Sequence, residues 1–138
     1  MSSFTAEKQP RPQFRNLNFP LLLTYRLPLP GLVSIMHRIS GAALFLALPL
    51  LLWMFDLSLS SELSFERLRA IASNFFFKLL LVFLIWGFFH HLVAGIRYLL
   101  LDLHIGIDLK AARASAIAVY AISLPLTLIA AFKVFGVF

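Results

Sequence analysis

The sequence has no cysteine and few charged residues. The 138-residue chain without a thiol argues against a disulfide-stapled secreted scaffold, a thiol enzyme, and a zinc or iron–sulfur protein built on cysteine. Charged residues make up 13% of the chain, about half the usual share, whereas hydrophobic residues reach 61%. A soluble domain of this size keeps too large a surface to hide so much apolar side chain. The composition therefore predicts an integral membrane protein.

Three apolar stretches are long enough to cross a lipid bilayer. They run over about 34–55, 75–101 and 114–135. Each holds roughly 20 residues or more, enough for a helix to cross a hydrocarbon core of about 30 Å. Strands of a membrane β-barrel would instead alternate apolar and polar residues. The sequence therefore predicts an all-α membrane protein with three transmembrane helices in 34–135.

Basic residues are spread unevenly around these spans. Residues 1–38 hold five Lys and Arg, the connection 56–74 holds two, and three lie in or just before the connection 102–113. The positive-inside rule therefore places the segment 1–33 and the second connection in the cytoplasm, and the first connection and the C-terminus on the other side. It also accounts for the net charge of +6 without nucleic acid as a partner.

Local signals indicate how the chain folds outside the spans. Five prolines oppose a regular helix in 1–33, since each fixes its backbone and lacks an amide donor: Pro10, Pro12, Pro20, Pro28 and Pro30. In the first connection, the stretch 60–66 (Ser-Ser-Glu-Leu-Ser-Phe-Glu) is typical of a helix start. We therefore expect a short interfacial helix there.

A hydroxyl and an arginine share one helical face at the cytoplasmic start of the first span. Ser34 and Arg38 are four residues apart, so they are neighbours on a helix and can bind a carbonyl or an anionic group. The alternative is that Arg38 reaches to the lipid headgroups while Ser34 caps the helix. Taken alone, His37 fits an interfacial polar residue.

Two adjacent histidines, His90 and His91, lie near the middle of the second span, where an unpaired imidazole is costly. Their side chains point about 100° apart, so one can face a cofactor while the other meets a neighbouring helix. Neutral imidazole in an apolar site is a good axial ligand for haem iron. An interhelical hydrogen bond is the alternative, and the residues alone do not decide which histidine would be the ligand.

Polar residues on the cytoplasmic side of these histidines fit the acidic edge of a haem. Tyr98 follows His91 by seven residues and so returns to the same face two turns nearer the cytoplasm. If a haem hangs from His91 with its propionates toward the cytoplasm, then Arg97 and Tyr98 lie where those acids would be. His37 and Arg38 start the first span at the same level.

Two motifs in the chain resemble those of the larger membrane-anchor cytochrome b subunits of succinate dehydrogenase, respiratory complex II. The first motif, Ser-x-x-His-Arg-x-Ser/Thr-Gly, is matched by Ser34, His37, Arg38, Ser40 and Gly41. The second, His-x-x-x-Gly-hydrophobic-Arg with an Asp five residues on, is matched by His91, Gly95, Ile96, Arg97 and Asp102. With the three spans and a weaker match at Arg11-Pro12, the resemblance covers nearly the whole chain.

The resemblance implies a role for individual residues. It makes His91 one axial ligand of a b-type haem and puts Ser34 and Arg38 in the ubiquinone site beside the iron–sulfur subunit. It puts His37, together with Arg38, near the haem propionates. Tyr98 departs from the family, which often has histidine or phenylalanine at that position.

The chain offers only part of such a site. No second histidine lies at a matching depth on another span, because His37 and His104 are both close to the cytoplasmic boundary. The opposite haem ligand is therefore expected from a partner, which the resemblance identifies as the smaller anchor subunit, so that this partner completes the helical bundle. The sequence also has no flavin-binding glycine fingerprint and no cysteines for clusters. Succinate oxidation is thus expected in the flavoprotein subunit, with electrons passing through the iron–sulfur subunit to ubiquinone.

We therefore expect this chain to be a subunit of succinate dehydrogenase that carries no flavin. It should span the inner (cytoplasmic) membrane of a bacterium, where its helices contact lipid. One alternative is the anchor of a fumarate reductase, which has the same architecture but oxidises menaquinol. The other is a membrane accessory subunit without haem, whose histidines only pack between helices.

Overall fold

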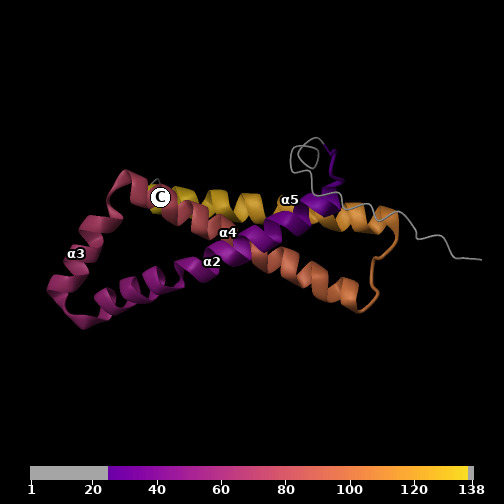
Figure 1. Ribbon diagram of the computed structural model, residues 1–138. Coiled ribbons are helices and arrows are strands. Elements are labelled where there is room, and N and C mark those ends of the chain that lie inside the picture. The colour runs from indigo at the N-terminus through magenta and orange to yellow at the C-terminus, as the bar shows by residue number, and fades with distance from the viewer. Residues whose placement is uncertain (1–24, 137–138) are drawn as a thin grey trace, which may run out of the picture.

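The computed structural model describes residues 25–136, which form four helices: α2 (Leu29–Ser60), α3 (Glu62–Ala72), α4 (Phe75–Asp102) and α5 (Leu109–Phe135). These described residues contain no strand, and three of the helices are long and apolar enough to cross a membrane. The predicted all-α class with three spans is confirmed (Figure 1). The expectations for Pro10, Arg11, Pro12 and Pro20 concern positions outside the described residues.

The first span is longer than the apolar stretch that indicated it. α2 has 32 residues, or about 48 Å at the rise of a helix. It starts at the prolines that were expected to oppose a helix, since Pro28 is the N-cap and Pro30 lies in the first turn. A first-turn residue has no helical acceptor for its amide, so proline fits there. Pro49 lies inside the helix.

The short helix expected after the first span is present as α3. The Ser61 hydroxyl accepts a hydrogen bond from the Ser64 amide at 3.1 Å, and the Ser64 hydroxyl accepts one from the Ser61 amide at 2.9 Å. This reciprocal capping box supplies acceptors for two amides, one of them an open amide of the first helical turn. Extended backbone at Ser61 redirects the chain, and α3 then joins one end of α2 to α4 (Figure 1).

The other two spans are also delimited by short-range hydrogen bonds. The Asn74 side chain accepts from the first amides of α4, and the Asp108 carboxylate accepts from the first amides of α5. Between them, residues 103–108 form a tight connection in which His104 and Gly106 take positive φ values of 61° and 74°. α5 contains Pro125 and ends at Gly136, whose φ of 72° forms a left-handed cap that favours glycine.

The long helices pack through small residues. α2 crosses α4, and α5 lies along α4 (Figure 1). The buried apolar centre consists of Val33, Ala94, Ala116 and Val119. Small side chains let helices approach closely in a membrane, where lipid is as apolar as leucine. Large apolar side chains instead cover the outside, with Phe45, Leu46 and Phe76 each about three-quarters exposed, so this outer surface suits lipid or further subunits.

Candidate functional site

His91 lies where α4 crosses α2, and its imidazole is held by the backbone of α2. Its Nδ1 is 3.1 Å from the carbonyl oxygen of His37 and 3.4 Å from Oγ of Ser40. Because a carbonyl only accepts, Nδ1 carries the proton as the donor. The neutral ring therefore keeps its lone pair on Nε2, which makes no hydrogen bond in the part of the chain that is described.

Ser40 supports this arrangement from inside the helix pair. Its side chain is buried, and its hydroxyl donates to the same His37 carbonyl at 2.9 Å. A carbonyl oxygen has two lone pairs and accepts both bonds. The serine and the imidazole thus share one acceptor, so the position of the His91 ring depends on two residues of the first motif.

Gly41 supplies the space for the ring. A Cβ atom built there would lie 2.8 Å from Cε1 and 3.2 Å from Nδ1 of His91, so any side chain would collide with the imidazole. The sequence matched Gly41 to a motif but gave it no role. The signal was available in the pair Ser40-Gly41, one small polar residue followed by one residue without a side chain.

The ring of His37 continues the row toward the end of α4. It stacks on the His91 ring with 4.1 Å between centroids and 9° between planes, and its centroid is 5.1 Å from that of Tyr98. Tyr98 therefore does return to the His91 face, as its spacing predicted. Its hydroxyl is buried and makes no hydrogen bond within 25–136, so this polar atom has no partner among the described residues.

His90 occupies a different environment from His91. It is fully buried between the rings of Trp86 and Tyr120, at centroid distances of 5.4 and 5.3 Å. Neither ring nitrogen makes a hydrogen bond within the described residues, and the polar group that faces it is the backbone of Val33. His90 is thus packed inside the three-helix contact, whereas His91 is only half-buried.

Ser34 and Arg38 lie one turn apart on α2, as predicted. Ser34 is half-buried and Arg38 is exposed, and neither makes a hydrogen bond or ion pair with any described residue. The alternative in which Ser34 caps the helix is wrong, because the N-cap is Pro28. Both side chains are therefore free to contact a ligand from outside the chain.

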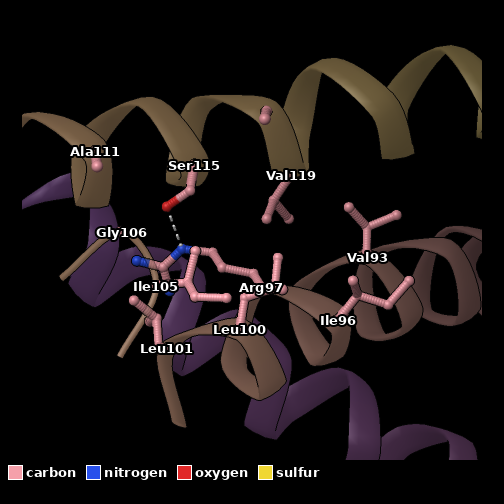
Figure 2. Close-up of a pocket in the computed structure, with 11 residues that line it drawn as sticks. Val93, Ile96, Arg97, Leu100, Leu101, Ile105, Gly106, Ala111, Ser115 and Val119 are labelled. Atoms are coloured by element: carbon pink, nitrogen blue, oxygen red, sulfur yellow. Dashed lines mark hydrogen bonds between the residues drawn. The ribbon is translucent and has the colours of Figure 1, made fainter. Parts of the chain in front are cut away.

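Arg97 is not in the row formed by His91, His37 and Tyr98. Its guanidinium turns toward α5, where Nε donates to the Ser115 hydroxyl at 2.9 Å (Figure 2). Nη2 donates to the Ala112 carbonyl at 3.3 Å. Its link to the row is contact with the Tyr98 ring, 5.3 Å from the guanidinium carbon to the centroid. Asp102, at the end of α4, forms no ion pair with it.

The fold and the site together define a helical membrane subunit that presents one half-buried imidazole at the crossing of two spans. Residues 8–130 match the family Succinate dehydrogenase/Fumarate reductase transmembrane subunit, and the chain belongs to this family. The family expected from the two motifs is thereby confirmed.

Individual relatives agree with this assignment. The chain is 33% identical over 110 residues to the succinate dehydrogenase cytochrome b556 subunit of Paracoccus denitrificans, covering 80% of this chain and 85% of that protein. The subunits of the same name from Rickettsia felis and Coxiella burnetii are each 34% identical, over 112 and 103 residues. Those matches cover 80% and 74% of this chain and 86% and 82% of the respective relatives.

Proposed function

We propose that this chain is the larger membrane anchor of a succinate:quinone oxidoreductase, that it binds a b-type haem through Nε2 of His91, and that it forms part of the ubiquinone site. The observation that carries the haem proposal is the state of the His91 ring. Nδ1 contacts the His37 carbonyl, and Nε2 makes no hydrogen bond to the described residues. A metal-binding histidine characteristically donates its other N–H to such an acceptor. The relatives' name, cytochrome b556, adds support for a b-type haem.

The residues near His91 fit the rest of the group. The buried Tyr98 hydroxyl without a partner suits a propionate oxygen, and His37 and Arg38 lie at the same end of α2. When bound, the haem supplies one-electron transfer, while these side chains orient it and offset the charge of its acids. We leave Arg97 out of this group, since its guanidinium faces α5.

A second protein ligand for the proposed haem would come from outside the described residues. His37 stacks beside His91, His90 is enclosed by protein, and His104 lies in the 103–108 connection. None of these imidazoles is opposite Nε2 of His91. The smaller anchor subunit is the proposed source. The iron–sulfur and flavoprotein subunits, which carry the clusters and the flavin, complete the proposed assembly.

The proposed ubiquinone contacts are Ser34 and Arg38. Arg38 would stabilise negative charge that develops on the quinone oxygen during reduction, and Ser34 would donate a hydrogen bond to it. Their lack of hydrogen-bond and ion-pair partners among residues 25–136 supports the assignment. We place this site at the cytoplasmic edge of the bacterial inner membrane, following the distribution of basic residues. The relatives named above are succinate dehydrogenase subunits, which favours succinate oxidation over fumarate reduction.

The visible spectrum of the purified assembly tests the haem proposal. We expect reduced b-type α and Soret bands in the native assembly and in His90→Ala, but their loss or strong change in His91→Ala. The two variants form a matched pair, since they remove adjacent imidazoles at the same depth. A colourless native assembly, or loss of the bands in His90→Ala alone, would refute the assignment of His91.

A further inference from the structure

A cavity lies between α4, α5 and the connection that joins them, away from the row formed by His91, His37 and Tyr98. Its volume is about 280 Å³. Its walls are apolar, formed among others by Val93, Ile96, Leu100 and Val119 (Figure 2). Arg97 is the one charged side chain that lines it.

The charge of Arg97 has no counterpart among the described residues. The side chain is only 7% exposed, and within 25–136 the sole ion pair joins Arg69 to Glu66. Its hydrogen-bond acceptors, the Ser115 hydroxyl and the Ala112 carbonyl, are neutral. A guanidinium has five N–H donors, so three remain without an acceptor here. A buried cation in a membrane helix is costly unless it is paired, and the cavity therefore lacks an anion.

The cavity faces away from the proposed haem. With about 100° per residue along a helix, Val93 and Leu100 lie on the side of α4 nearly opposite His91. Arg97 is five residues from the end of α4 at Asp102, or about 8 Å along the axis. Arg97 thus lies just inside the end of α4, where a spanning helix is expected to reach the level of the lipid phosphates.

We propose that this cavity binds a membrane phospholipid, with its phosphate on Arg97 and part of one acyl chain against the apolar walls. An amphiphile with a single anionic group matches the chemistry of the site, because one cation stands at the end of an otherwise apolar surface. The rest of the lipid would lie along the exposed part of wall residues such as Ile96, which is 51% exposed. Exposed Lys110 and Arg113 at the start of α5 favour an anionic headgroup.

The test compares the phospholipid retained by the assembly after purification in detergent. We expect the native assembly to keep anionic phospholipid in a fixed molar ratio, measured by extraction and by mass spectrometry of the intact complex. Arg97→Gln should lower this retention about tenfold, which is the factor expected from the loss of one charge-assisted hydrogen bond. Arg67→Gln is the control, since it removes an exposed arginine on α3 that does not line the cavity, and it should keep the lipid.

A second variant leaves the arginine in place. Ala118 lines the cavity, so Ala118→Phe should fill it and lower lipid retention as well. Haem absorbance and subunit composition should be unchanged in both variants. Retention of the lipid in Arg97→Gln would overturn the proposal. Unchanged lipid in Arg97→Gln together with a shifted haem band would instead indicate that Arg97 binds a haem propionate. Unchanged lipid together with loss of a subunit would indicate that Arg97 pairs with a carboxylate of a partner subunit. Inorganic phosphate that binds the lipid-depleted assembly as tightly as phospholipid would also contradict a lipid site.

Discussion

Replacing Gly41 by alanine should displace His91 from α2. The new Cβ would lie 2.8 Å from Cε1 of the imidazole, whereas ordinary van der Waals contact begins at 3.4 Å. The ring must therefore retreat by about 0.6 Å, the difference between these two distances. A retreat of that size along the Nδ1–oxygen direction would stretch the 3.1 Å contact with the His37 carbonyl beyond hydrogen-bond range.

The expected effect follows from the loss of this orientation. Overpacking of this kind costs about 1–3 kcal/mol, and removal of the group that orients a metal ligand typically lowers metal affinity about 10–100-fold. We therefore expect haem content in Gly41→Ala to fall by about tenfold or more. The helix itself should persist, since alanine is a better helix former than glycine.

The assay is haem per assembly, measured from the reduced visible spectrum of protein purified from membranes. Gly87→Ala is the matched control, because its Cβ would lie 3.9 Å from the nearest heavy atom, Cβ of Ser40. This control should keep its haem. Full haem content in Gly41→Ala, or an equal loss in Gly87→Ala, would refute the argument that this glycine holds the space for the imidazole.

Three further outcomes follow from the described contacts. Arg38→Ala should cut succinate:quinone activity but spare succinate oxidation by an artificial acceptor; unchanged quinone reduction would remove Arg38 from the site. Ser40→Ala should weaken haem retention up to about tenfold because the His91 ring loses the hydroxyl that lies 3.4 Å from its Nδ1, whereas Ser40→Thr, which keeps a hydroxyl, should retain the haem. Ser61→Ala should destabilise α3 by about 1 kcal/mol, read as roughly fivefold faster amide hydrogen exchange there, whereas Ser58→Ala should not; equal exchange in both variants would contradict the capping box.

The elements of this fold were predictable because each has a local cause. Long apolar runs predict spans, and a serine pair three residues apart predicts the start of α3 through hydrogen bonds within one turn. The start of α2 was not predicted, because proline opposes a helix in its interior but fits its first turn. Pro28 and Pro30 were therefore compatible both with a segment that is not helical and with the start of a helix, until the helix boundary was known.

Contacts between spans were harder to predict, for a reason specific to membranes. A soluble helix reveals its buried face by an apolar stripe, whereas α2, α4 and α5 are apolar on every side. The sequence therefore located His91 within its span but did not predict where that span crosses α2. The His37 carbonyl that accepts from the ring is a backbone group, and no residue type in the sequence predicts such a contact.

Spacing along one helix nevertheless contained more information than depth alone, and Arg97 demonstrates it. Tyr98 is seven residues after His91, about 20° short of two full turns, so it returns to the same face. Arg97 is six residues after His91, which rotates it by about 120° from that face and toward a different neighbour. The observed contacts follow this difference, since Tyr98 meets His37 on α2 and Arg97 meets Ser115 on α5. In a span without an apolar stripe, the angle between two polar residues still predicts that they serve different neighbours, even when their depths are nearly equal.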